Sequence, residues 1–177
     1  MKKSFPKLKE IEKKCSHVKL ILTDVDGVLT DGGRYYSKSG EMIKKFHVRD
    51  GMGINLLLRN NIKTVIITKE KSMIVKNWAK EMNVFQVRMG VKRKELELPK
   101  ICNKFHLTKN EIAYIGDDVN DIDLMKKINL SSTPKDGIEQ VKQIVDYICK
   151  SKGGKGAFRE FADLILAKKF PQMKKWY

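Results

Sequence analysis

The amino-acid sequence predicts an α/β fold: a doubly wound (Rossmann-like) parallel sheet with a β-hairpin inserted after the first strand and no cap domain. Short apolar segments alternate with segments of helical periodicity, which is typical of a parallel sheet covered by helices on both faces. The 177-residue chain is 41% hydrophobic and 33% charged, a composition typical of globular proteins. This length fits one domain, so residues 1–177 are expected to fold as a single unit.

The first half of the chain is expected to begin with a helix and to continue as alternating strands and helices. Apolar residues at Phe5, Leu8, Ile11 and Cys15 have the spacing of one helix face. In order, we expect a basic N-terminal helix within residues 1–17, a strand at 18–23, a hairpin within 33–46, a helix at 50–60 with Asp50 as its cap, a strand at 63–68, a helix at 72–82 and a strand at 84–87.

The second half continues this alternation as far as a final amphipathic helix. Pro99 falls within a helical segment at 92–105 and is expected to kink or shorten it. In order, we then expect a capping box at 108–111, a strand at 112–115, a helix at 120–127, and a C-terminal segment at 153–177 that comprises a glycine-rich break (153–156), a final helix (157–167) and a basic tail.

The formal net charge of +16 is concentrated at the two ends of the chain. Residues 1–19 carry +5 and residues 168–177 carry +4. No stacking aromatics alternate with the lysines and no nucleic-acid-binding motif is present. We therefore interpret the ends as solvated lysine-rich segments, with anion steering or a polyanion partner as the alternatives, and do not expect nucleic acid as a partner.

Several features predict a cytoplasmic protein without a membrane partner. No apolar run approaches the ~18–20 residues that span a bilayer. The charged start at Met1 is not followed by the apolar core of a secretory signal. Cys15, Cys102 and Cys149 are odd in number and far apart, so they predict reduced thiols and neither a zinc site nor a disulfide framework.

Two acidic clusters follow predicted strands. Asp24 and Asp26 come after the strand at 18–23, and Asp117, Asp118 and Asp121 come after the strand at 112–115. Because the carboxyl ends of parallel strands meet at one edge of a sheet, these five carboxylates are expected to share a crevice. They would repel one another without a cation. Oxygen ligands with no nearby His or Cys favour Mg²⁺.

These residues resemble the four motifs of the haloacid-dehalogenase superfamily of phosphotransferases. Residues 24–32 (DVDGVLTDG) resemble motif one, Thr68 resembles motif two, Lys94 resembles motif three and residues 116–121 (GDDVND) resemble motif four. The match runs in order over nearly the whole chain. It implies a Mg²⁺-dependent phosphomonoester hydrolase that forms an aspartyl-phosphate intermediate.

Two further segments are similar to the capless ulosonic-acid phosphatases of this superfamily, namely residues 46–54 (FHVRDGMGI) and 153–162 (GGKGAFREFA). That subfamily includes 3-deoxy-D-manno-octulosonate 8-phosphate phosphatases and acylneuraminate (nonulosonate) 9-phosphate phosphatases. The resemblance implies a single phosphatase domain that acts on a small sugar-acid phosphate.

The resemblance implies a catalytic role for four residues. Asp24 would be the nucleophile and Asp26 the general acid and base. Thr68 and Lys94 would donate hydrogen bonds to the phosphoryl oxygens. Lys92 is the alternative candidate for the motif-three lysine.

A metal role is implied for the acidic clusters. Mg²⁺ would be bound by the Asp24 side chain, the Asp26 backbone carbonyl and Asp117. Asp118 and Asp121 would be accessory residues.

The spacing of the motifs leaves no room for a cap. Only 18 residues separate Asp31 from Asp50, and 25 separate Thr68 from Lys94. The apolar side chains of the hairpin either pack on their own domain or form a subunit interface. The resemblance implies a homotetramer built by this hairpin, in which neighbouring subunits cover the site. These apolar side chains are Tyr35, Tyr36, Met42, Ile43 and Phe46.

Glu70, Arg49 and Arg159 are the candidate substrate-binding residues. The resemblance implies the role of Arg159, because the glycine-rich segment reaches an active site in the related enzymes. An ion pair of Arg159 with Glu160 or Asp163 is the alternative.

Glu70 is where the chain departs from the octulosonate pattern. Residues 67–70 read ITKE, whereas octulosonate phosphatases usually read ITGR. A carboxylate there disfavours contact with a sugar acid's own carboxylate. The sequence therefore predicts a nonulosonate 9-phosphate as substrate, with 3-deoxy-D-manno-octulosonate 8-phosphate as the alternative.

Three further functions remain open. Two are enzymatic: a general small-sugar phosphatase, and a polynucleotide phosphatase suggested by the charge. The third is a non-catalytic assembly domain related to cytidylyltransferase-linked phosphatase-like domains. The intact pair Asp24 and Asp26 favours an enzyme, because a purely structural domain has no reason to keep it.

Overall fold

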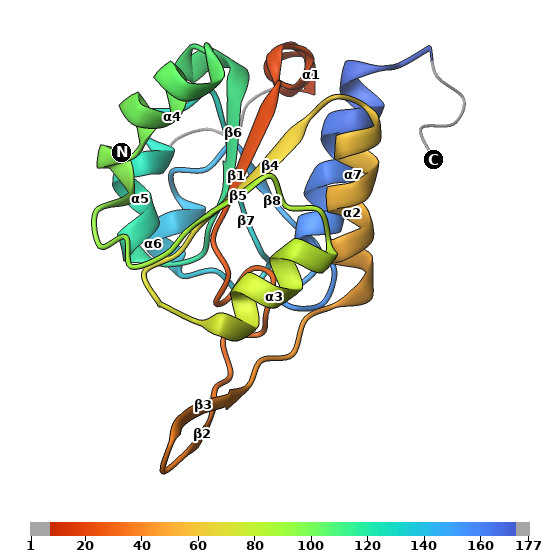
Figure 1. Ribbon diagram of the computed structural model, residues 1–177. Coiled ribbons are helices and arrows are strands. Elements are labelled where there is room, and N and C mark those ends of the chain that lie inside the picture. The colour runs from red at the N-terminus through yellow and green to blue at the C-terminus, as the bar shows by residue number, and fades with distance from the viewer. Residues whose placement is uncertain (1–7, 173–177) are drawn as a thin grey trace.

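Six parallel strands form the central sheet of the computed structural model, which describes residues 8–172 (Figure 1). They are β1 (Leu20–Thr23), β4 (Lys63–Ile67), β5 (Gln86–Arg88), β6 (Ile112–Ile115), β7 (Leu130–Thr133) and β8 (Tyr147–Ile148). The spatial order β5-β4-β1-β6-β7-β8 places β1 between β4 and β6. The predicted doubly wound parallel sheet is therefore confirmed.

Helices cover both faces of this sheet (Figure 1). The α-helices are α1 (Leu8–His17), α2 (Val48–Arg59), α3 (Met73–Glu81), α4 (Leu98–Phe105), α5 (Ile122–Met125), α6 (Glu139–Lys142) and α7 (Ala157–Lys169). Short 3₁₀ helices are η1 (Lys94–Leu96), η2 (Lys109–Glu111) and η3 (Val119–Asp121). Among residues 8–172, no helix combines the length and the apolar character needed to cross a bilayer.

The central strand β1 contributes to two separate cores. Ile21 belongs to the apolar cluster under α1, α2, α3 and α7. Leu20 and Leu22 belong to the cluster under α4, α5 and α6. Because both faces of β1 are buried, its sequence is a continuous apolar run rather than an alternating one. The two cores fix the position of the loop that follows β1.

Strands β7 and β8 and helix α6 are absent from the sequence-based prediction. They are only four, two and four residues long. β7 reads LSST, with one strongly apolar residue, yet all four residues are buried because β7 pairs with both β6 and β8. Tertiary pairing therefore outweighs a weak local signal.

Pro99 shortens its helix, as expected. Helix α4 begins at Leu98, so Pro99 lies in the first turn, where a missing N–H removes no helical hydrogen bond. Residues 94–96 form the separate turn η1. The expected helix at 120–127 likewise divides into η3 and α5. Residues 5–7 of the expected first helix and residues 173–177 of the basic tail lie outside the described residues.

Asp50 does not cap the helix in which it lies, contrary to expectation. Helix α2 begins at Val48, and His47 is its N-cap. The Asp50 carboxylate instead accepts hydrogen bonds from the backbone N–H groups of Gly156 (3.2 Å) and Arg159 (2.9 Å), at the start of α7. The carboxylate thus satisfies free N–H groups at the N-terminus of a different helix.

The hairpin, β2 (Tyr35–Ser37) with β3 (Gly40–Ile43), projects from the body of the molecule (Figure 1). Phe46 packs on its own domain, stacked on Trp78 with ring centroids 4.1 Å apart. The other apolar side chains are 53–62% exposed in the single chain, namely Tyr35, Tyr36, Met42 and Ile43. This distribution leaves an apolar surface on the hairpin.

Candidate active site

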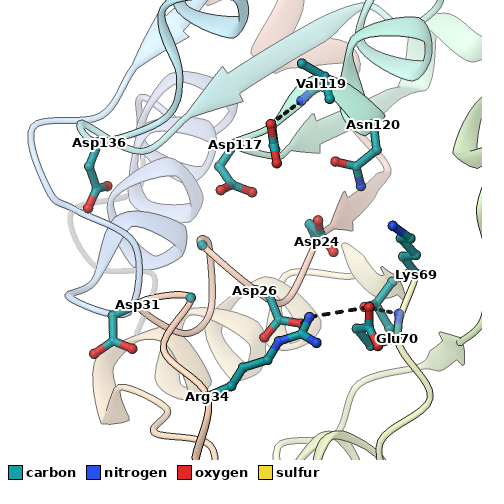
Figure 2. A pocket seen from close by; sticks show the side chains of 14 residues that line it. Asp24, Asp26, Asp31, Arg34, Lys69, Glu70, Asp117, Val119, Asn120 and Asp136 are labelled. Carbon is teal, nitrogen blue, oxygen red and sulfur yellow. Dashed lines mark hydrogen bonds and ion pairs between the residues drawn. The ribbon is translucent and has the colours of Figure 1, made fainter.

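A polar cavity of about 440 Å³ lies at the carboxyl ends of β1, β4 and β6 (Figure 2). The loops that follow these three strands supply most of its wall, and Arg34 before β2 and Asp136 after β7 supply the rest. The lining residues are Asp24, Asp26, Gly27, Asp31, Gly32, Arg34, Thr68, Lys69, Glu70, Asp117, Asp118, Val119, Asn120 and Asp136. The structure thus places four of the five predicted carboxylates around one cavity, whereas the fifth, Asp121, is fully buried and does not line it.

Asp24, directly after β1, is paired with a buried lysine. Lys94 Nζ lies 2.6 Å from Asp24 Oδ2 and 2.7 Å from Asp121 Oδ1, and the Lys94 side chain is fully buried. The Tyr114 hydroxyl donates a 2.5 Å hydrogen bond to the same Asp121 oxygen. Lys92, the alternative motif-three lysine, is exposed. Lys94 is therefore the lysine that neutralises charge beside Asp24.

Asp121 is already occupied by other contacts. Its Oδ1 accepts from Lys94 and Tyr114. Its Oδ2 accepts from the backbone N–H groups of Asp117 (2.8 Å) and Asp118 (3.2 Å). Asp121 therefore holds the loop after β6 in place, and Asp118 lies exposed at the cavity, accepting from the Val119 N–H at 2.7 Å.

Asp117 has the environment of a cation ligand. Its Oδ1 is buried and has no hydrogen-bond partner. Burial, together with the charges of Asp121 and Asp24, raises the pKa of Asp117 to about 8. Burial likewise raises the pKa of Asp24 to about 6, although Lys94 opposes that shift. A cation beside these carboxylates would favour their ionised forms.

The residues present therefore fit a Mg²⁺ ion. One carboxylate oxygen from each of Asp24, Asp117 and Asp121 lies within 4.8 Å of the others. Since the Asp121 oxygens are engaged elsewhere, we assign Asp24 and Asp117 as the carboxylates that would hold the ion. Hard oxygen donors without nitrogen or sulfur suit Mg²⁺.

Gly27 makes room for Asp117. Its φ is +83°, a conformation that other residues rarely adopt. A Cβ atom at this position would lie 2.0 Å from Asp117 Oδ2. The turn after β1 therefore requires glycine, both for its backbone conformation and for the close approach of the Asp117 carboxylate.

Both oxygens of the Asp26 carboxylate are paired with cations from the hairpin region. Lys44 Nζ contacts Oδ1. Arg34 Nη2 lies 3.3 Å from Oδ2. Burial alone would lower the pKa of Lys44, but its contacts with Asp26 and Glu41 outweigh burial and raise that pKa, so Lys44 is a cation at neutral pH.

Thr68 and Glu70 occupy the loop after β4. Thr68 is buried at the cavity wall, and its hydroxyl accepts the Glu70 backbone N–H at 3.3 Å. The Glu70 carboxylate lies 3.4 Å from Arg34 Nη2. Figure 2 marks this ion pair with a dashed line. The negative charge on which the predicted nonulosonate preference depends is therefore paired with a cation within the same cavity.

Two sequence-predicted substrate-binding residues lie away from this cavity in the single chain. Arg49 is exposed at the start of α2. Arg159 Nε donates to both oxygens of Asp163, at 2.8 and 2.9 Å, which is the alternative considered for it. The glycine-rich segment packs on its own domain, where the Gly154 N–H donates to the Val28 carbonyl at 2.9 Å.

Four residues of the site have no role in the sequence analysis. Arg34 and Lys44 belong to a segment whose pattern predicts a hairpin. Tyr114 belongs to an apolar strand. Asp136 follows β7, which the sequence pattern does not reveal; its Oδ1 accepts the Gly153 N–H at 2.9 Å. Only the charge of Arg34 and Lys44 within an apolar hairpin was a visible signal.

These observations define the class of protein. A partly desolvated aspartate beside a buried lysine can attack a phosphoryl group, and an adjacent carboxylate can exchange protons with the leaving oxygen. Oxygen donors for Mg²⁺ complete the requirements of phosphoryl transfer. The chain is a phosphatase. It belongs to the haloacid dehalogenase-like hydrolase family, whose sequence profile matches residues 58–160.

Relatives of known name support this assignment. The 3-deoxy-D-manno-octulosonate 8-phosphate phosphatase KdsC of Haemophilus influenzae is 36% identical over 156 residues, covering 88% of this chain and 87% of its own. KdsC of Escherichia coli K12 is 35% identical over 153 residues, covering 86% and 81%. The predicted resemblance to ulosonic-acid phosphatases is thereby confirmed.

Solved structures show the same fold. The Moraxella catarrhalis octulosonate 8-phosphate phosphatase, in complex with magnesium, phosphate and KDO, superposes with a TM-score of 0.89 at 35% identity, covering 92% of this chain and 94% of that one. The cobalt-bound Haemophilus influenzae enzyme gives a TM-score of 0.86 at 36% identity, covering 88% and 91%. Among residues 8–172 of this chain, no cap domain covers the cavity.

Proposed function

We propose that the chain hydrolyses 3-deoxy-D-manno-octulosonate 8-phosphate to the free sugar acid and inorganic phosphate, with Mg²⁺ as cofactor. The main observation behind the phosphatase chemistry is the 2.6 Å contact between Lys94 Nζ and Asp24 Oδ2, beside an open cavity whose carboxylates can hold a cation. The names of the relatives support the substrate.

The chain's own residues supply the steps. Asp24 Oδ attacks phosphorus, and the bond between phosphorus and the sugar oxygen breaks while Asp26 gives that oxygen a proton. Asp26 then removes a proton from water, which attacks phosphorus and breaks the bond to Asp24, releasing phosphate. Lys94 and Thr68 balance phosphoryl charge. A bound Mg²⁺ would further neutralise the phosphoryl oxygens.

The nonulosonate substrate predicted from Glu70 has less support. That prediction requires an unpaired carboxylate facing the sugar acid. Arg34 lies 3.4 Å from Glu70, so the pair presents no net charge to the substrate. The guanidinium that the ITGR pattern places after β4 is here provided from the hairpin, which favours the octulosonate alternative.

The test is a comparison of kcat/KM for the octulosonate 8-phosphate and a nonulosonate 9-phosphate in the presence of Mg²⁺. We expect the octulosonate ester to be preferred, and Asp24→Asn to release no phosphate from either ester. A wild-type preference for the nine-carbon ester would restore the prediction made from Glu70.

We also propose that the active form is a homotetramer in which the hairpins meet. The supporting observation is the exposure of the apolar side chains on a projecting hairpin, since a free two-stranded hairpin gains little by exposing them. Such an assembly would cover a cavity that the described residues of one chain leave open.

A further inference from the structure

Lys44, directly after β3, is buried between two carboxylates. Its side chain has no exposed surface. Its Nζ contacts Asp26 Oδ1 and lies 2.9 Å from Glu41 Oε1. A fully buried ammonium group is tolerated only when it is paired, so these contacts fix the position of the lysine.

Glu41 connects this lysine to the body of the domain. Its Oε2 accepts a 2.5 Å hydrogen bond from the Ser72 hydroxyl. Ser72 is the N-cap of α3, just after the loop that carries Thr68. The contacts from Asp26 through Lys44 and Glu41 to Ser72 therefore join the loop after β1 to the start of α3, which follows the loop after β4.

The two cations beside Asp26 differ in their surroundings. Arg34 contacts the other carboxylate oxygen at 3.3 Å, but its side chain is 29% exposed and faces the cavity. Lys44 is enclosed and absent from the cavity lining. Lys44 can therefore hold the carboxylate without touching the substrate.

We propose that Lys44 is a positioning residue for Asp26: by holding Oδ1 it directs Oδ2, the oxygen beside the cavity-lining Arg34, at the leaving oxygen, and Oδ2 carries the proton that is transferred. This inference rests on the proposed function, in which Asp26 gives a proton to the departing sugar alkoxide. An alkoxide needs that proton, because it is a poor leaving group. A p-nitrophenolate ion leaves without one. Loss of the lysine should therefore slow the first step selectively for sugar and alkyl phosphates.

The experiment compares the first turnover of Lys44→Met on octulosonate 8-phosphate and on p-nitrophenyl phosphate, by quenched flow with Mg²⁺. We expect the first turnover of the sugar phosphate to slow by ~10²-fold, and that of the nitrophenyl ester to remain within ~3-fold of wild type. Lys45→Met is the matched control. The neighbouring Lys45 side chain is 60% exposed, and both of its rates should stay at the wild-type level.

An equal loss on both esters would mean that Lys44 only supports the fold, and no loss on either would remove its role altogether. Glu41→Gln keeps Lys44 but weakens the contact that holds it. This variant should also slow the sugar phosphate selectively, at about a tenth of the effect. It tests the role of Lys44 if Lys44→Met does not fold. If wild-type protein cleaves p-nitrophenyl phosphate but not the octulosonate ester, the proposed substrate fails. Glycerol 2-phosphate, another alkyl ester, then replaces it in the same comparison.

Discussion

Arg34 and Glu70, which both line the cavity, form an ion pair, with Arg34 Nη2 3.4 Å from Glu70 Oε1. The two residues come from different parts of the chain, one at the start of the hairpin and the other in the loop after β4. The same guanidinium group also reaches Asp26. If the chain has the proposed function, we expect recognition of the anionic sugar acid to depend on the pair rather than on Glu70 alone.

This relationship predicts the effect of Arg34→Gln on substrate binding. The variant leaves Glu70 unpaired, so its carboxylate repels the sugar acid, and the KM for the octulosonate ester should rise ~10-fold. The double variant Arg34→Gln/Glu70→Gln should recover most of that loss, as a double-mutant cycle would show. Additive effects of the two substitutions would mean that the pair is not coupled.

Substitutions of the two aspartates after β1 should have different effects. Asp24→Asn removes the nucleophile, so phosphate release should stop. Asp26→Asn keeps the nucleophile and loses proton transfer, which should lower kcat by ~10²–10⁴-fold. Steady-state assays with Mg²⁺ and circular dichroism of each variant check both outcomes. Wild-type turnover by a folded Asp24→Asn would falsify the aspartyl-phosphate mechanism.

Gly27→Ala should weaken Mg²⁺ binding. A Cβ atom 2.0 Å from Asp117 Oδ2 displaces that carboxylate, so Mg²⁺ affinity or activity should fall ~10- to 100-fold. Gly40→Ala is the control, because Gly40 also has positive φ (+112°) but has no atom within 4 Å of the added methyl group. In titrations of activity with Mg²⁺, the concentration that gives half-maximal activity should rise for Gly27→Ala and stay unchanged for Gly40→Ala.

The hairpin surface predicts the oligomeric state. Light scattering at micromolar concentration should show a tetramer for the wild-type chain. Ile43→Lys should dissociate it, because a charge is placed in a buried apolar contact. Leu96 is similarly exposed (49%) but lies in η1, so Leu96→Lys should leave the tetramer intact. A wild-type monomer with full activity would contradict the assembly.

The sequence predicts well those parts of the molecule in which local pattern and chemistry coincide. β1 and β6 are continuous apolar runs buried on both faces, and each ends in aspartates that can be recognised without a structure. Their convergence follows from the parallel sheet itself. The lysine of motif three was ambiguous between Lys92 and Lys94, because one position in a loop carries no periodic signal.

The remaining features depend on contacts between distant segments. Lys44 and Arg34 reach Asp26 only because the two ends of the hairpin lie beside the loop after β1, which no spacing rule indicates. Ser131 and Ser132 are buried because β7 pairs with β6 on one side and with β8 on the other. The sequence predicts Asp50 as a cap of its own helix. Its carboxylate instead accepts the Arg159 N–H at the start of α7, 109 residues further along the chain.

Asp50 gives a prediction about stability and pH. The residue is fully buried, and burial raises the pKa of its carboxyl from 3.8 to about 6, although the N–H groups of α7 oppose the shift. Between these two pH values the folded chain holds a proton that the unfolded chain has released. The free energy of unfolding should therefore fall as pH rises through this window, by ~3 kcal/mol at most from this group, and level off above it.

Asp50→Asn isolates this contribution. The amide cannot ionise, so the stability of the wild type relative to the variant should decline between pH 4 and about 6. Asp50→Ala also leaves the N–H groups of Gly156 and Arg159 without an acceptor, so it should be less stable than Asp50→Asn by ~2–4 kcal/mol at every pH. Urea unfolding across this pH range measures both differences. The opposite result would be a free energy of unfolding that rises with pH for the wild type relative to Asp50→Asn. In that case the N-terminus of α7 stabilises the carboxylate more than burial destabilises it, and the pKa of Asp50 is not raised.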